Sequence, residues 1–173
     1  IVKLQPSLPL NSRPVTLADV GVLHRFYLQS KRYFEIIAAP LPSIEDVTRE
    51  LETALSNPRR RLEFYCSAEE VVAYLDTTLD YPKTGDVTVN LLLVAEQKQH
   101  LGLGSQIMLR LESQLKSRTK RILAGVFGHN SRAVRFWERL GYYFAVDARP
   151  VLSWYAKDLE PSEQAQKKEI VMQ

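Results

Sequence analysis

The chain has 173 residues, 45% of them hydrophobic and 25% charged, and a formal net charge of +3; this composition suits one globular domain and gives no support for a nucleic-acid partner. Cys66 is the only cysteine, which excludes an intramolecular disulfide and favours a reducing, cytoplasmic setting. No apolar run reaches the roughly 20 residues that a membrane-spanning helix needs, and no secretion signal follows Ile1, so no membrane partner is expected.

The hydrophobic pattern alternates between the period of strands and that of helices, with no internal repeat or linker. In chain order the expected elements are a strand at 8–14, helices at 16–28 and 43–56, strands at 61–67, 71–79 and 86–95, a helix from a pair of glycines to about 115, a strand at 121–127, a helix at 131–140, and strands at 142–146 and 151–156. Pro9 keeps the first strand short or at a sheet edge, and Pro40 and Pro42 would break a helix in the mixed segment 29–42. One mixed α/β domain is expected over 1–173, in which the polar residues 160–173 form a flexible tail.

The chain is organised around the stretch from Val89 to Leu115. An apolar strand, Val89–Ala95, leads through a polar turn to Gly102 and Gly104, and a helix follows. The first N–H groups of a helix have no partner within it, and with the helix dipole they attract an anion, which glycine allows close to the backbone. Alone, this turn predicts either a phosphate site or a flexible turn that binds nothing. It matches neither the dinucleotide fingerprint, which needs a third glycine at Ile107, nor a P-loop, which needs lysine after the last glycine.

Two patterns together resemble signatures of the GNAT acetyltransferase superfamily. The first is Gln99-x-x-Gly102-x-Gly104, preceded by Leu92-Leu93-Val94, and the second is Asn130-x-x-Ala133-x-x-Phe136-Trp137-x-x-x-Gly141-Tyr142. The resemblance covers about residues 8–157 and is specific over 86–142, and the order of the elements agrees with it. It implies a GNAT-like acyl-CoA N-acyltransferase fold of the α/β class, with a splayed mixed sheet of about six to seven strands flanked by about four helices.

The resemblance also implies acetyl-CoA as co-substrate and no metal. The main chain of residues 92–94 would pair with the pantetheine arm like an added strand, and the amides of residues 99–105 would hold the pyrophosphate. The residues expected to bind the cofactor are Leu92, Leu93, Val94, Gln99, His100, Leu101, Gly102, Leu103, Gly104, Ser105, Asn130, Ala133 and Phe136. The turn has few of the family's usual basic residues, so phosphate binding is expected to depend more on amides than on charge, and His100 reads as an exposed surface histidine.

The groups that transfer protons are left open. Many members of the family carry a tyrosine, proposed to protonate the departing thiolate, where this chain has Trp137, which has no acidic proton to give and is equally well explained as a core residue. Candidate substitutes are Tyr142, Tyr143 and Tyr155. Candidate general bases are Glu63, Asp76, Asp86 and Glu96, each of which is also explained as a solvated charge at a strand end. Asn90 occupies a position on the central strand, but an amide cannot act as a base.

By the same resemblance, the acceptor enters opposite CoA, which here places Tyr33, Phe34 and Glu35 across from Tyr155. This aromatic and acidic lining would favour a cationic amine, although Tyr33 and Phe34 are also explained as core residues. The expected activity is direct acetyl transfer to a primary amine of a small molecule or peptide in a ternary complex, by a monomer or homodimer. Cys66 has no histidine nearby in sequence, which argues against a covalent route. The alternatives are a non-catalytic acyl-CoA-binding module and a nucleotide-binding protein that uses the same glycine turn.

Overall fold

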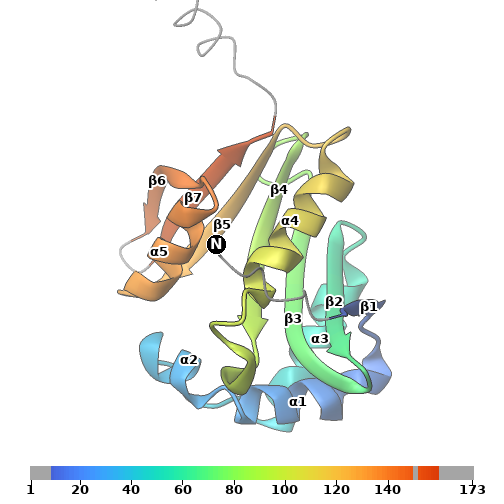
Figure 1. The fold of residues 1–173 in the computed structure, drawn as a ribbon. Helices are drawn as coiled ribbons and strands as arrows, with labels where there is room; N and C mark the ends of the chain where they lie inside the picture. Colours follow the sequence, from blue (N-terminus) through green and yellow to red (C-terminus); the bar gives the residue numbers. More distant parts are fainter. Residues whose placement is uncertain (1–8, 150–151, 160–173) are drawn as a thin grey trace, which may run out of the picture.

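The computed structural model describes residues 9–149 and 152–159, with side chains described outside 146–153 (Figure 1). The described residues form one seven-stranded sheet in the order β1-β2-β3-β4-β5-β7-β6. The strands are β1 (Asn11–Pro14), β2 (Arg60–Ser67), β3 (Glu70–Leu79), β4 (Asp86–Val94), β5 (Arg121–Phe127), β6 (Tyr143–Arg149) and β7 (Leu152–Asp158). The helices are α1 (Val20–Leu28), α2 (Lys31–Ile36), α3 (Ile44–Ser56), α4 (Leu103–Leu115) and α5 (Ser131–Arg139), with short 3-10 turns at Leu17–Asp19 and Glu96–Lys98. The expected tail, 160–173, lies outside the described residues.

Helices cover both faces of the sheet, and each face has its own core. Figure 1 shows α4 and α5 in front of the sheet and α3 behind it. Leu23 of α1 and Leu51 of α3 are fully buried against β2 and β3 in one core, whereas Ile107 of α4 and Trp137 of α5 belong to the other. Because helices cover both faces, the central strands β3 and β5 are buried on both sides. This burial explains the nearly continuous apolar runs in the sequence at 71–79 and 121–127.

Capping boxes stand at the start of the first 3-10 turn and of α3. The Ser43 hydroxyl accepts a hydrogen bond from the Asp46 N–H at 3.1 Å, and the Asp46 carboxylate accepts one from the Ser43 N–H at 2.9 Å. The Thr16 N–H donates in the same way to Asp19 at 2.9 Å. Gly141, with a φ of 87°, adopts the left-handed conformation that commonly ends a helix. These local signals place α1, α3 and α5 within a few residues of their predicted positions.

The sheet splits between β4 and β5, and this split positions the site. The two strands pair in parallel along Asp86–Val89 and Arg121–Ala124, after which β5 continues beside β7 and leaves β4. On the other side of β4, Asp76 pairs with Leu91 and Thr77 with Val89, so Asn90 is an extra residue in a β-bulge. A bulge bends its strand and increases the twist, which directs the second half of β4 away from β5.

Three expectations about the fold need correction. The described residues contain five α-helices rather than about four, because α2 forms within the segment assigned no regular element. Its six residues end before Ala38, which has a φ of 53°, so the prolines at 40 and 42 never enter the helix. The last two strands lie later in the chain than expected. The first strand is short and at the sheet edge, as predicted from Pro9, but begins at Asn11.

No helix among the described residues is long and apolar enough to cross a bilayer.

Candidate active site

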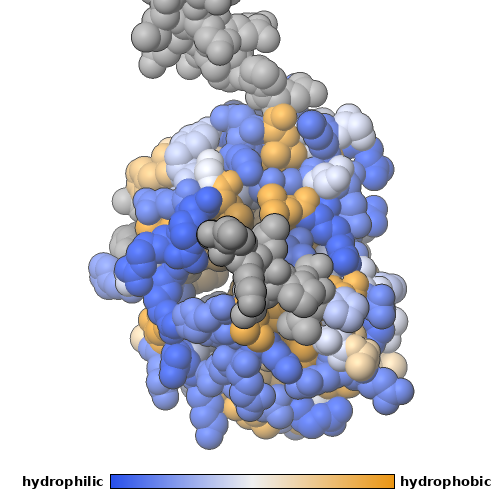
Figure 2. Space-filling view, in the orientation of Figure 1, coloured by the Kyte–Doolittle hydropathy of each residue, from blue (hydrophilic) through white to orange (hydrophobic). Residues whose placement is uncertain are grey.

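The split between β4 and β5 contains two adjoining cavities. The larger has a volume of about 370 Å³ and the smaller about 90 Å³. Both are lined by Tyr33 of α2, Leu92 of β4, Asn130, and Ala133 and Trp137 of α5. Figure 2 shows a hollow at this place, between the hydrophilic surfaces of α5 and α2. A ligand that spans the two cavities would therefore lie between the separated strands.

The larger cavity brings together residues that are far apart in the sequence. It is lined by every residue expected to bind the cofactor except Leu101, which is 51% exposed. Residues 92–94 come from β4, 98–105 from the turn and the start of α4, and 130–136 from the start of α5. Because β4 leaves β5 after Val89, the main chain of residues 90–94 has no strand beside it on the cavity side. The cavity thus combines a free strand edge with two helix N-termini.

The turn before α4 has the backbone conformation of an anion site. His100 has a φ of 64° and Gly102 a φ of 80°, both left-handed, and no side chain caps the helix. The first intrahelical bond joins the Gln106 N–H to the Gly102 carbonyl oxygen at 3.0 Å, so the preceding amides are available to a ligand. Gly104 also allows α4 and α5 to approach, since an added Cβ would lie 3.1 Å from the Phe136 ring.

Five cationic side chains line the larger cavity, and none of them is among the site residues expected from the sequence. They are Arg32, Lys98, Arg132, Arg135 and Arg139. The three arginines of α5 follow one another at i, i+3 and i+7, which places them on one helix face, and this spacing was visible in the sequence. Arg132 lies 2.6 Å from the Nε2 of His100 and so joins α5 to the turn. The expectation that phosphate binding depends more on amides than on charge did not take this helix face into account.

Trp137 is both core and cavity wall. It is 6% exposed and packs against Phe136 and Tyr142, at ring-centroid distances of 4.9 and 5.0 Å. The tyrosines considered as substitutes lie outside both linings: Tyr142 donates to Glu112 at 3.1 Å, Tyr143 donates to Asp158 at 2.7 Å, and Tyr155 packs on Phe144. Tyr33 is the tyrosine that lines both cavities, and burial, together with the charge of Glu50, raises the pKa of its hydroxyl to about 12.

Most of the candidate bases lie away from the cavities. Glu63 accepts a hydrogen bond from Tyr65 at 3.3 Å on β2, and Asp86 is ion-paired with Arg121 at 2.8 Å where β4 begins. Glu96 accepts the Arg32 N–H at 2.8 Å. None of the three is among the residues lining either cavity.

The expected acceptor residues are divided. Tyr33 lines both cavities, as described above. Phe34 packs edge-on against Tyr27, with ring centroids 5.5 Å apart, and Glu35 is exposed; neither lines a cavity. The acidic lining expected at this place is therefore absent from the described residues.

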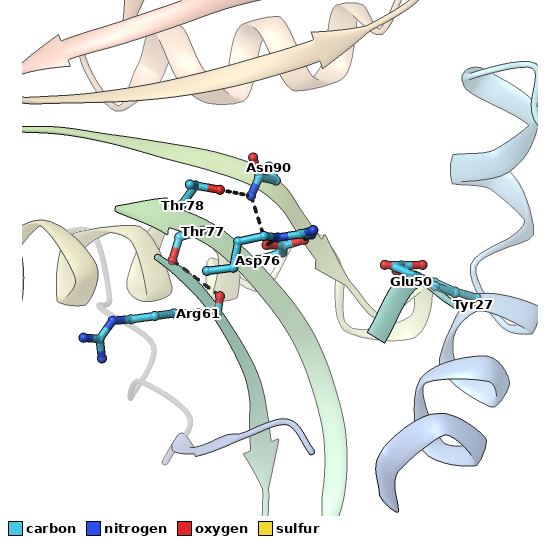
Figure 3. A network of polar contacts seen from close by, with 8 residues as sticks. Tyr27, Glu50, Arg61, Asp76, Thr77, Thr78 and Asn90 are labelled. Carbon is cyan, nitrogen blue, oxygen red and sulfur yellow. Dashed lines mark hydrogen bonds and ion pairs between the residues drawn. The ribbon is translucent and has the colours of Figure 1, made fainter. Parts of the chain in front are cut away.

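Asp76 lines neither cavity, but its carboxylate is hydrogen-bonded to Asn90, which lines the smaller one. The Asp76 side chain is 4% exposed and ion-paired with Arg60. The Asn90 side-chain nitrogen donates to the Asp76 carboxylate at 3.0 Å and to the Thr78 hydroxyl at 2.8 Å (Figure 3). Asn90 lines the smaller cavity, and its hydrogen bond to Asp76 fixes the position of its side chain there.

Glu50 on α3 gives the protein a pH-dependent stability. Burial and the charge of Asp76 raise the pKa of Glu50, and the Tyr27 hydroxyl donates to it at 2.7 Å. A carboxyl whose pKa is raised in the folded state contributes less stability as the pH rises through that pKa. Glu50→Gln keeps a hydrogen-bond acceptor for Tyr27 and removes the buried charge that lowers the stability at high pH. Measured by urea unfolding, the variant should therefore be more stable than the wild type at pH 7 but not at pH 4. Glu52→Gln, on the exposed face of α3, is the matched control and should change the stability by less than about 0.5 kcal/mol.

Comparisons with known proteins agree with this geometry. The model of the acetyltransferase (GNAT) family matches residues 24–142. The crystal structure of an acetyltransferase from Thermus thermophilus is 40% identical to the chain and superposes with a TM-score of 0.84, covering 87% of this chain and 97% of that one. A search among curated proteins returned no match.

Two structures that contain coenzyme A share the fold at lower identity. Aminoglycoside acetyltransferase AAC(6')-Ib is 18% identical, with a TM-score of 0.72 over 92% of this chain and 98% of that one. PaiA N-acetyltransferase from Thermoplasma acidophilum is 14% identical, with a TM-score of 0.68 over 87% and 99% of the two chains. The residues matched by the family model, 24–142, contain the split strand β4, the glycine turn and α5, and this match shows that the chain belongs to the acetyltransferase (GNAT) family.

Proposed function

We propose that the protein transfers the acetyl group of acetyl-CoA to a primary amine of a small molecule or peptide, by direct attack in a ternary complex. The observation that carries this proposal is the larger cavity, in which the free edge of β4 leads from the glycine turn to the smaller cavity. A linear ligand with phosphates at one end and a reactive group at the other matches this arrangement.

The lining residues suit the successive parts of acetyl-CoA. The amides at the start of α4, with Arg132 and the other cations, supply donors and positive charge for the phosphates. The main chain of residues 92–94 offers strand-like hydrogen bonds to the pantetheine amides. Bound in this way, acetyl-CoA supplies an activated acetyl thioester beside the smaller cavity. Trp137 and Tyr33 would then enclose the reacting end and exclude water.

The position of Trp137 does not prevent transfer. A thiol with a pKa of about 8.5 is a tolerable leaving group near neutral pH, and a positioned acid contributes about 10²–10⁴-fold, so its loss slows the reaction without stopping it. Tyr33, with a pKa of about 12, keeps its proton at neutral pH and lines both cavities. We therefore assign Tyr33 as the candidate phenol donor to the departing sulfur.

Calorimetry and a thiol-release assay test the proposal together. Acetyl-CoA should bind, and free CoA thiol should appear when a panel of primary amines is added. Binding with slow hydrolysis and no stimulation by any amine would favour a non-catalytic acyl-CoA-binding module, which Trp137 also suits. No binding at millimolar acetyl-CoA would overturn both, and a thermal shift with NAD or ATP alone would indicate a nucleotide-binding protein.

Removing one cation of the cavity should weaken binding measurably. Arg132→Gln is expected to lower acetyl-CoA affinity about tenfold, since a hydrogen bond to a charged group is worth about 1.5–3 kcal/mol and 1.4 kcal/mol is tenfold. Calorimetry at two salt concentrations measures the affinity and its salt dependence, which should also decrease. Arg118→Gln removes an exposed arginine outside the cavity and should leave both unchanged. Equal effects of the two variants would contradict the role of Arg132.

A further inference from the structure

The smaller cavity has an uncharged wall. It lies between α2, the split strands and α5, and its polar side chains are the amides of Asn90 and Asn130 and the hydroxyl of Tyr33. The rest of its lining is aliphatic or aromatic, including Ile37, Phe127 and Trp137. Among the residues whose side chains the structure describes, none that lines this cavity carries a charge.

The charged side chains near this cavity either pair with a partner of opposite charge or lie outside its lining. Asp76 of β3 lies behind Asn90, and its charge is balanced by Arg60 of β2. Glu50 of α3 accepts the Tyr27 hydroxyl and lines neither cavity, and the cations of α5 line the larger cavity alone. An ammonium group in the smaller cavity would lose water without meeting a carboxylate, and desolvation disfavours the charged form of an amine.

Asn90 offers the cavity a hydrogen-bond acceptor of known orientation. Its side-chain nitrogen donates to the Asp76 carboxylate and the Thr78 hydroxyl, so its Oδ1 is left on the opposite side. Figure 3 shows this oxygen pointing away from Asp76, toward β5 and the split. The reverse orientation would place Oδ1 against an ionised carboxylate, which has no proton to share, so the hydrogen bonds fix the amide. An amide oxygen accepts an N–H but cannot remove a proton.

We infer that the acceptor is an amine with an apolar substituent that binds as the uncharged free base, with its N–H donated to the Oδ1 of Asn90. This inference rests on the proposed acetyl transfer. The amine nitrogen uses its lone pair to form the C–N bond, and the thioester C–S bond breaks with its electron pair going to sulfur. Tyr33, the donor assigned above, protonates that sulfur, and the surplus N–H proton restores the Tyr33 hydroxyl. A free base needs no carboxylate to remove a proton before it attacks. The smaller cavity can therefore serve the reaction without an acidic side chain in its lining.

The inference predicts which amines react best. An α-amino group has a pKa of about 7.7–8.0 and an alkylamine such as that of lysine about 10.4, so their free-base fractions differ about 300-fold at pH 7 and about tenfold at pH 9.5. Phenylalanine amide is 2-phenylethylamine with a carboxamide on the carbon that carries the amine, and this group lowers the pKa of the amine. Phenylalanine amide should have the higher kcat/KM at pH 7, with the gap narrowing toward pH 9.5. Diaminopentane, which brings a second positive charge and no apolar end, should be the poorest of the three.

The dependence of KM on pH gives the decisive measurement on the wild-type protein. If 2-phenylethylamine binds as the free base, its KM is expected to depend on pH when it is expressed as total amine. At pH values below the pKa of the amine, each increase of one pH unit should lower this KM about tenfold, while kcat stays constant. A KM that is independent of pH, with kcat rising as a group titrates, would mean that the ammonium binds and would overturn the inference. So would a preference for diaminopentane at pH 7. Acetyl-CoA binding without turnover of any amine at any pH would instead overturn the proposed function, and this inference with it.

A variant tests the role of Asn90 separately. Asn90→Leu keeps the branched shape of the side chain and removes the acceptor, so kcat/KM for phenylalanine amide should fall about tenfold, chiefly through KM, while the acetyl-CoA affinity is unchanged. That unchanged affinity also shows that the variant is folded. Asn11→Leu, on exposed β1, is the matched control and should behave as the wild type. Unchanged kinetics in Asn90→Leu would refute the assignment of Asn90, and the wild-type pH series decides the rest if the variant fails to fold.

Discussion

Gly104→Val should weaken acetyl-CoA binding by about a hundredfold. The new Cβ would stand 3.1 Å from the Cε2 and Cζ of Phe136, and the two methyl groups of valine extend further, so the Phe136 ring must shift. Overpacking of this kind costs about 1–3 kcal/mol, and a hundredfold loss of affinity corresponds to about 2.7 kcal/mol. Phe136 lines the larger cavity beside the start of α4, which binds the phosphates in the proposed complex. Calorimetric titration with acetyl-CoA measures the change.

The control for this substitution is another helical glycine. At Gly21 in α1, an added Cβ would meet only the end of the flexible Arg25 side chain, at 3.6 Å. Gly21→Val should therefore retain the wild-type affinity for acetyl-CoA. Circular dichroism melting of both variants separates a local change from unfolding. Wild-type affinity in Gly104→Val would show that the approach of α4 and α5 is not needed for binding.

Arg60→Leu should lower the free energy of unfolding by about 3–5 kcal/mol, the usual effect of leaving one partner of a buried ion pair uncompensated. The Asp76 side chain is 4% exposed, and Arg60 is its cationic partner. The loss should appear in urea unfolding at pH 7. Because Asp76 orients Asn90, the variant should also have a higher KM for the amine.

The double variant Arg60→Leu/Asp76→Leu should recover most of the lost stability, since replacing both charges with apolar groups removes the unpaired carboxylate. Arg61→Leu changes the neighbouring residue of β2, whose side chain is exposed, and should alter stability by less than about 0.5 kcal/mol. If the double variant is no more stable than Arg60→Leu, the loss comes from packing rather than from the buried charge.

Features encoded by neighbouring residues were predictable from the sequence. The capping boxes at Thr16 and Ser43, the turn with Gly102, and the left-handed Gly141 each depend on residues within a few positions of one another. The family resemblance then placed the expected cofactor residues, and all but Leu101 line one cavity. The seven strands and their order along the chain were predicted from the hydrophobic pattern of each segment, which is also a local feature.

Features that depend on contacts between distant segments were missed. Arg60 and Asp76 are paired because β2 and β3 are in register, and no local pattern identifies Arg60 as the partner. Arg32 and Lys98 reach the cavity from α2 and the turn, 66 residues apart by their numbers. The short helix α2 carries no strong periodic signal, since six residues make fewer than two turns. Such features require the fold before they can be seen.

The split in the sheet also bears on how the protein avoids aggregation. A row of unpaired main-chain groups along a strand edge is a template for strands of other molecules, and natural proteins shorten or cover such edges. At one outer margin, β1 has four residues and ends on Pro14. The free edge of β4 lies inside the molecule, between β5 and the helices that line the cavity. A slender linear ligand can reach it, but the edge of another folded sheet cannot, so the main-chain groups needed for binding are kept from self-association.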